Sequence, residues 1–241
     1  MRPIQRALAI IYPHQCVLCD AQTEEAGALC PSCWAETPFL RGHLCDACGA
    51  PLVGESDGKL DTCDACLASP RPWQKGRAAW AYSGAGRTIT LRIKHSDRTD
   101  LIPPAADWMA RAGRDILKDE PLLIPIPIHW TRRIRRRYNQ SAELARAIGK
   151  VAGCPVAPDT LLRLRVTRVH ENLDAGERYA NQTGSMMVDS SKKLCLSERK
   201  LVLVDDVMTS GATLTEACRV LHAAGAKRIS CLVLARALPR P

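Results

Sequence analysis

The chain has 241 residues, of which 46% are hydrophobic and only 4% aromatic, and its formal net charge is +9. A chain of this length and hydrophobicity can bury one well-packed core beside a small additional module. It contains no run of about 18 apolar residues, which excludes a membrane-spanning helix. The positive charge indicates either a polyanionic partner or simply a basic proteome.

Residues 1–16 combine basic and apolar side chains, which is also the character of a short signal peptide. The apolar stretch is short, however, no small-residue cleavage site follows it, and closely spaced cysteines begin at once. We therefore expect a short helix here that packs on the rest of the protein, and a cytoplasmic location.

Eight of the twelve cysteines form four pairs of the Cys-x-x-Cys type: Cys16/Cys19, Cys30/Cys33, Cys45/Cys48 and Cys63/Cys66. Two such pairs complete a tetrahedral zinc site. The loops between them are too short for a hydrophobic core, so metal must supply the folding energy of this region. Four thiolates leave no open coordination position, and we predict two structural zinc ions. Sequential pairing, which makes a double zinc ribbon, is favoured, with crossed pairing as the alternative.

The other four cysteines are isolated, and we expect them to be packing residues: Cys154, Cys195, Cys218 and Cys231. A proline-rich link at 69–72 follows the zinc region. We place the boundary between two modules at this link, with a double zinc ribbon at 1–70 and an α/β domain at 71–241.

Beyond the link, apolar runs of strand length alternate with helical spacing, which favours an α/β sheet. In chain order, we expect a strand at 78–82, helices through 89–94 and 101–117, a strand at 122–128, a helix at 141–152, and strands at 201–204 and 228–235. The prolines within 122–128 predict an irregular end to that strand.

The densest charge cluster follows this proline-containing strand, at Arg132, Arg133, Arg135, Arg136 and Arg137. An arginine run is often a solvated loop. Here, however, it leaves the carboxyl end of an apolar strand, where open α/β sheets place their ligands, and arginine binds phosphate bidentately. The cluster exceeds what one pyrophosphate needs, so these arginines are also candidates for contact with nucleic acid.

The apolar strand at 201–204 ends in two adjacent carboxylates, Asp205 and Asp206, and a short polar loop leads from them into a helix. A loop at a helix N-terminus directs backbone N–H groups toward one point, which suits phosphate. Carboxylates repel phosphate, so we expect this pair to hold sugar hydroxyls or Mg2+. The alternative is an ordinary strand–helix unit whose acid pair caps the helix.

This stretch resembles the phosphoribosyl-pyrophosphate (PRPP) motif of type I phosphoribosyltransferases. The resemblance implies that Asp205 and Asp206 hold the ribose hydroxyls. It also implies that the following loop wraps the 5′-phosphate through Thr209, Ser210, Gly211, Ala212 and Thr213.

Several further segments resemble the ComF family, whose members are phosphoribosyltransferase-like, commonly carry an N-terminal zinc ribbon, and are tied to DNA uptake in natural competence and to nutrient use of DNA. These segments are I-P-I-P-I-H-W-T-R-R at 124–133, R-Y-N-Q at 137–140, and a pattern formed by Thr167, Leu173, Glu177, Arg178 and Asn181. The resemblance covers essentially the whole chain. It implies a parallel sheet flanked by helices, preceded in the chain by the N-terminal zinc module.

The resemblance also suggests which residues meet the pyrophosphate and its Mg2+: His129, Arg132 and Arg133 after the strand at 122–127, and Arg168 and Arg178 in a mobile hood at 163–186. No catalytic acid or base can be identified. Three functions remain open. They are a salvage phosphoribosyltransferase, a competence-type protein that handles single-stranded DNA with DNA-uptake proteins and keeps the PRPP site, and a PRPP-responsive regulator without turnover.

Overall fold

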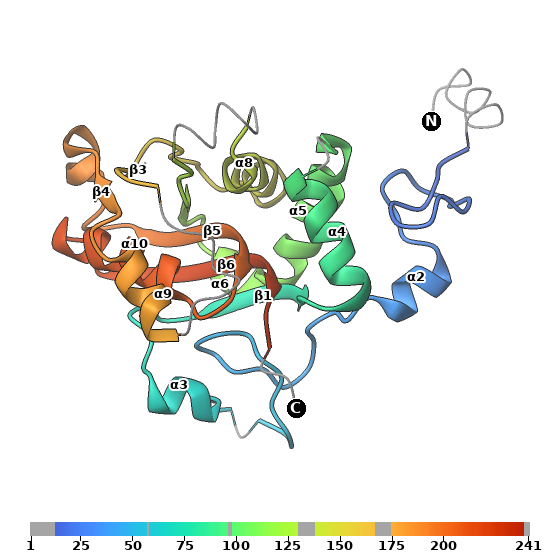
Figure 1. Cartoon of the computed structure of the whole chain (residues 1–241), viewed down its shortest axis with the longest axis horizontal. Helices are drawn as coiled ribbons and strands as arrows, with labels where there is room; N and C mark the ends of the chain where they lie inside the picture. Colours follow the sequence, from blue (N-terminus) through green and yellow to red (C-terminus); the bar gives the residue numbers. More distant parts are fainter. Residues whose placement is uncertain (1–12, 57, 96–97, 130–137, 167–174, 239–241) are drawn as a thin grey trace.

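The computed structural model describes residues 13–56, 58–95, 98–129, 138–166 and 175–238, so most of the predicted N-terminal helix lies outside the described residues. A four-stranded sheet forms the centre (Figure 1). Its order is β1 (Gly76–Ala81), β6 (Arg228–Arg236), β5 (Lys200–Met208) and β2 (Leu122–Pro125). All neighbouring strands are parallel, and a further parallel bridge joins Leu123 to Val156. The predicted α/β fold with a parallel sheet is confirmed.

Strand β5 is buried on both faces, the environment that a continuous apolar run of strand length favours. Leu201 and Leu203 pack into one buried cluster, whereas Val202 and Val204 pack into the cluster on the opposite face. The strand does not end at the acid pair. It continues to Met208 because β6 keeps pairing with it as far as Arg236.

Helices cover both faces of the sheet (Figure 1). One face carries α4 (Gly84–His95), α5 (Ile102–Ala112) and α8 (Gln140–Ala152), and the other carries α10 (Ala212–Ala223). The expected single helix at 101–117 is divided into the 3-10 turn η1 (Thr99–Leu101), α5 and α6 (Arg114–Leu117). The division falls at Gly113, where a Cβ atom would come within 2.9 Å of Leu232.

The segment predicted to form a hood makes a small unit beside α10. Strands β3 (Leu161–Arg163) and β4 (Met186–Val188) pair antiparallel, and helix α9 (Ala175–Gln182) precedes β4. Helix α10 contacts both α9 and β4. The 3-10 turn η3 (Ser190–Cys195) then leads into β5.

The zinc region wraps around the β1 edge of the sheet, and its described residues include the short helices α2 (Pro31–Glu36) and α3 (Asp64–Ala68) (Figure 1). Val17 of the first ribbon packs into the core on the α4 side, and its carbonyl accepts a hydrogen bond of 2.9 Å from Arg92. Cys45 and Cys66 of the second ribbon are buried in the core on the α10 side. The two ribbons therefore contact opposite faces of the sheet. None of the helices among the described residues has the length and apolarity to span a bilayer.

Candidate functional site

The carboxyl ends of β2 and β5 meet where the strand order reverses. The chain leaves β2 outward, toward Val156, and returns on the other side of β2 as β5. Open α/β sheets bind ligands in the crevice at such a point. The loop that follows β2 contains the buried His129, and the loop that follows β5 contains the predicted phosphate-binding residues.

The acid pair lies at this crevice between α4 and α8. Asp205 is 9% exposed, and its carboxylate accepts hydrogen bonds of 2.9 Å from the Ser141 hydroxyl and from the Asp206 N–H. Ser141 is in the first turn of α8, where the side chain of the N-cap residue Asn139 accepts from the Ser141 N–H. The Asp206 carboxylate lies 3.8 Å from the Lys94 ammonium group of α4.

The electrostatics of the pair favour a ligand that brings hydrogen-bond donors or positive charge. Burial raises the pKa of Asp205 to about 7, and the charge of Asp206 adds to the effect. The Asp206 N–H, Ser141 and Lys94 oppose the increase. Sugar hydroxyls or a divalent cation would stabilise the ionised pair further, because both interact best with the charged form of a carboxylate.

The loop after β5 forms the wall of a shallow hollow, which is lined by Asp205 and by residues 207–214. Gly211 is the N-cap residue of α10 and has a φ of 86°, a left-handed conformation that favours glycine. A Cβ atom there would also lie 3.0 Å from the Arg71 guanidinium and 3.2 Å from the Trp73 ring. Glycine is therefore required for the backbone conformation and for the close packing beneath the loop.

Three successive carbonyl groups of this loop are held by side chains from the protein body. The guanidinium of the buried Arg236 donates to the carbonyls of Met208, at 3.1 Å, and Thr209. The Ser210 carbonyl accepts from Arg71 at 2.6 Å and from the Tyr179 hydroxyl at 3.1 Å.

The direction of these carbonyls determines where the loop N–H groups point. In a planar trans peptide, the C=O and the following N–H point in opposite directions. With the Thr209 and Ser210 carbonyls turned inward, the N–H groups of Ser210 and Gly211 are directed away from the two arginines. Together with the N-terminal turn of α10, this arrangement has the form of an anion-binding nest.

A cavity of about 300 Å³ lies beside the first turn of α8, and neither carboxylate of the acid pair lines it. Its walls come from the end of β2, α8 and β3, and include Pro127, Asn139, Ala142, Asp159 and Arg163. This volume is at the lower end of the range of small-molecule sites. The sequence did not indicate this space, because its walls come from segments that are distant in the chain.

Two of the residues predicted to contact the pyrophosphate, His129 and Arg178, lie within the described part of the chain. His129 is buried directly after β2, and Arg178 is half-buried on α9, next to Tyr179. The remaining predicted arginines lie outside the described residues: Arg132, Arg133, Arg135, Arg136, Arg137 and Arg168.

Most of the groups that position the acid pair and the loop are not indicated by any pattern in the sequence. Ser141 is 64 positions away from Asp205, and Arg71 is 139 positions away from Ser210. Arg71 belongs to the proline-rich segment that was interpreted as a link. No local pattern distinguishes it from a solvated linker residue, since its partners become neighbours only in the folded chain.

The eight paired cysteines form two clusters with the predicted sequential pairing. Cys16, Cys19, Cys30 and Cys33 make one cluster, and Cys45, Cys48, Cys63 and Cys66 make the other, with the sulfur atoms of each within 4.8 Å of one another. Thiolates bound to tetrahedral zinc lie ~3.8 Å apart. The Cys19–Cys30 and Cys48–Cys63 sulfur distances are 3.6 and 3.7 Å. Both clusters thus fit a structural zinc ion. Of the other cysteines, Cys154, Cys218 and Cys231 are buried, as expected for packing residues.

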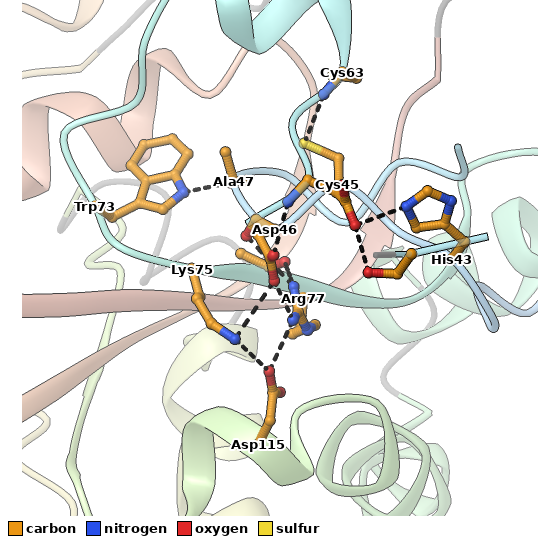
Figure 2. Close-up of polar contacts among 12 residues, drawn as sticks. His43, Cys45, Asp46, Ala47, Cys63, Trp73, Lys75, Arg77 and Asp115 are labelled. Atoms are coloured by element: carbon orange, nitrogen blue, oxygen red, sulfur yellow. Dashed lines mark hydrogen bonds and ion pairs between the residues drawn. The ribbon is translucent and has the colours of Figure 1, made fainter. Parts of the chain in front are cut away.

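The second cluster is fixed to the sheet by a charged network (Figure 2). Arg77 of β1 lies 2.7 Å from Asp46 and 2.8 Å from Asp115, and Lys75 lies within 3.5 Å of both carboxylates. Burial acts to raise the pKa of Asp46, but Arg77 and Lys75 lower it overall. Trp73 adds a hydrogen bond of 2.6 Å from its indole N–H to the Ala47 carbonyl. The second ribbon is therefore tightly attached to the α/β domain.

Comparison with known families agrees with this description. A double zinc ribbon domain matches residues 7–67, and a phosphoribosyl transferase domain matches residues 143–240. The fold and the cysteine clusters define a phosphoribosyltransferase-type protein with an N-terminal double zinc ribbon.

Relatives match over most of the chain. The "DNA utilization protein YhgH" of Salmonella typhimurium is 28% identical over 218 residues, which cover 87% of this chain and 91% of that protein. "Competence protein F" of Haemophilus influenzae is 26% identical over 222 residues, covering 86% and 96%. A "Ribose-phosphate pyrophosphokinase" of Sulfurisphaera tokodaii is 28% identical over 134 residues, covering 50% and 44%. The resemblance that the motifs predicted is confirmed: a double zinc ribbon precedes a phosphoribosyl transferase domain, and relatives named for DNA utilization and for competence match most of the chain.

Proposed function

We propose that this protein binds PRPP with Mg2+ at the carboxyl ends of β2 and β5 and acts in DNA uptake or in the use of imported DNA. One observation carries the proposal. The acid pair at Asp205 and Asp206 lies beside a loop whose carbonyls at 208–210 are held by the protein body, so that acceptors for a sugar and N–H donors for a phosphate adjoin each other.

Each part of PRPP has a matching group in this arrangement. The ribose hydroxyls would donate to the carboxylates of Asp205 and Asp206, which hold sugar and Mg2+ better than they hold phosphate. The 5′-phosphate would accept from the N–H groups of 209–213 and from the hydroxyls of Thr209, Ser210 and Thr213. Lys94 lies against the acid pair and would face the anionic side of the ligand. When bound, Mg2+ neutralises charge on the pyrophosphate.

The biological role is supported by the relatives that match this chain over most of their own length. Their names refer to DNA utilization and to competence. The net charge of +9 is compatible with a nucleic acid partner. We infer that the PRPP site serves, or is regulated with, the handling of imported single-stranded DNA.

The cavity beside α8 favours a second candidate function. A phosphoribosyl transfer needs room for an acceptor next to the ribose, and about 300 Å³ adjoins the helix turn that carries Ser141. This size suits a small acceptor such as a nucleobase. In that case the protein would be a salvage phosphoribosyltransferase rather than a PRPP-binding accessory protein.

Isothermal titration with PRPP and Mg2+ tests the proposed site. Wild-type protein should bind, whereas Asp205→Asn and Asp206→Asn should weaken binding ~100-fold or more, because each removes a charged acceptor from a desolvated site. Asp100→Asn, which changes an exposed carboxylate paired with Arg98, is the matched control and should bind like wild type. Unchanged binding by both site variants would contradict the assignment.

Two further measurements on the same samples separate the candidate functions. Pyrophosphate release in the presence of a panel of nucleobases would support phosphoribosyl transfer. Single-stranded DNA binding that weakens steeply with salt, without pyrophosphate release, would support the DNA-handling role.

A further inference from the structure

Arg71 connects the second cysteine cluster directly to the phosphate loop. Its Nε donates to the Cys66 sulfur at 3.4 Å, and its Nη1 donates to the Ser210 carbonyl at 2.6 Å and to the Tyr179 hydroxyl at 2.8 Å. One guanidinium thus contacts a metal-ligand candidate, the loop after β5 and helix α9 of the hood. Because the guanidinium is planar and rigid, a displacement of Cys66 would displace the hydrogen-bond donor of the Ser210 carbonyl as well.

The packing around Arg71 leaves it little freedom to take another position. Its guanidinium lies 5.7 Å from the centroid of the Trp73 ring, which is 5% exposed and is hydrogen-bonded to Ala47 of the second ribbon. Gly211 packs closely on both side chains, since a Cβ atom there would lie 3.0 Å from Arg71 and 3.2 Å from Trp73. The second ribbon therefore forms the floor on which this half of the loop rests.

The other half of the loop is held by the sheet. The Met208 and Thr209 carbonyls accept from Arg236, which is the last residue of β6 and pairs with Met208 in the parallel ladder. Arg236 is positioned by strand pairing, and its charge also acts to lower the pKa of Cys48 in the second cluster. The Ser210 carbonyl, by contrast, is held by a guanidinium that is itself hydrogen-bonded to the Cys66 sulfur, so the two halves of the loop have different supports.

The first cysteine cluster provides an internal contrast. It packs on the opposite face of the sheet, where Val17 lies in the α4 and α5 core. The hydrogen bond from Arg92 to the Val17 carbonyl attaches it to α4. Its metal would stabilise the first ribbon without contacting the floor of the phosphate loop.

We propose that Arg71 is a positioning residue that makes the phosphate affinity of the loop depend on zinc at the second cluster. Four thiolates outweigh the charge of one zinc ion, so the loaded cluster is anionic and attracts the guanidinium. Loss of the ion releases the Cys63–Cys66 knuckle from the Cys45–Cys48 knuckle, and with it the sulfur that orients Arg71. The Ser210 carbonyl then loses its partner, and the Gly211 N–H loses its fixed direction.

The test compares full-length variants of the two clusters with variants of Arg71. Cys63→Ser removes a ligand of the second cluster but keeps the Cys66 sulfur, and Cys19→Ser is the matched change in the first cluster. Arg71→Met removes the hydrogen bonds, and Arg71→Lys keeps the charge without the planar fork. Zinc content, hydrogen exchange at the single amides of 209–213, and ribose 5-phosphate affinity are measured for each variant.

We expect Cys63→Ser and Arg71→Met each to accelerate exchange at Gly211 and to weaken ribose 5-phosphate binding about tenfold, the loss of one charge-assisted hydrogen bond. Arg71→Lys should recover part of the affinity. The double variant Cys63→Ser/Arg71→Met should bind ribose 5-phosphate no more weakly than either single variant, since both changes break the same connection. Cys19→Ser should lose one zinc ion and leave the loop unchanged.

Two results would overturn the proposal: wild-type exchange at Gly211 in Cys63→Ser after its zinc is lost, or equal effects of Cys19→Ser and Cys63→Ser. If Cys63→Ser does not fold, the proposal is tested with Arg71→Met and Arg71→Lys. In that case, hydrogen exchange at the Gly211 amide that is equal in Arg71→Met and wild type overturns the proposal. The binding readout rests on the proposed function, but the exchange readout does not. Wild-type protein that fails to bind ribose 5-phosphate would therefore count against the proposed function only.

Discussion

Replacing Asp205 by asparagine should stabilise the unliganded protein at neutral pH while it removes PRPP binding. Asparagine has nearly the same size, and its carbonyl oxygen can accept from the Ser141 hydroxyl and the Asp206 N–H, as the carboxylate does. Only the charge is lost. The wild-type carboxyl has a pKa of about 7, because it is buried and because Asp206 is adjacent.

The raised pKa determines the sign of the effect. An aspartate in the unfolded chain has a pKa of ~3.9, so between the two values the folded state holds a proton that the unfolded state has released. The stabilisation by this proton is complete below pH ~3.9 and is lost as the pH rises through about 7. Each pH unit in that range costs the wild-type protein ~1.4 kcal/mol, and asparagine has no such dependence.

The free energy of unfolding should therefore rise in the Asp205→Asn variant, relative to wild type, by roughly 2 kcal/mol between pH 5.5 and pH 7.5. Urea unfolding of both proteins, measured side by side at pH 5.5, 6.5, 7.5 and 8.5, gives this difference. The side-by-side comparison removes the pH dependence of zinc binding, which both proteins share. A difference that stays constant over this pH range would refute the reasoning, because Asp205 would then titrate near its ordinary value.

Three further predictions follow from the same contacts. PRPP affinity should increase between pH 6 and pH 8 as Asp205 ionises, and a flat calorimetric profile would contradict this. Gly211→Ala should raise the dissociation constant for ribose 5-phosphate ~10-fold, since Ala must adopt a φ of 86° and would contact Arg71; unchanged affinity would show that the loop accommodates a Cβ atom. Arg77→Met should reduce the free energy of unfolding by about 2 kcal/mol, because Asp46 keeps only Lys75 as a cationic partner. Urea denaturation checks this value, and Lys75→Met, which leaves the shorter Arg77 contact intact, should have the smaller effect.

The sequence predicted features that depend on local pattern. The cysteine spacing predicted two sites because a Cys-x-x-Cys turn orients both thiolates by itself, and sequential pairing joins the nearest turns. Residues 201–204 are all buried and pack alternately on the two faces of the sheet, which agrees with a continuous apolar run, because only a strand covered on both faces can bury such a run. The carboxyl-end location of the acid pair then followed from parallel sheet topology.

Features that depend on distant partners were not predictable in the same way. The end of β5 is determined by its pairing with β6 up to Arg236, so the apolar run alone placed it too early. The break at Gly113 reflects close contact with Leu232, which lies on a strand far along the chain. Arg71 has two proline neighbours, a composition typical of a linker, yet it contacts Cys66, Tyr179 and Ser210.

The position of the 5′-phosphate in a crystal structure of the protein with PRPP and Mg2+ is the most direct test of the proposed site. We predict a phosphate within hydrogen-bond distance of the N–H groups of Ser210 and Gly211, with the ribose hydroxyls on Asp205 and Asp206. A phosphate bound elsewhere, for example in the cavity lined by Asn139 and Arg163, with no ligand atom in contact with the acid pair, would contradict it.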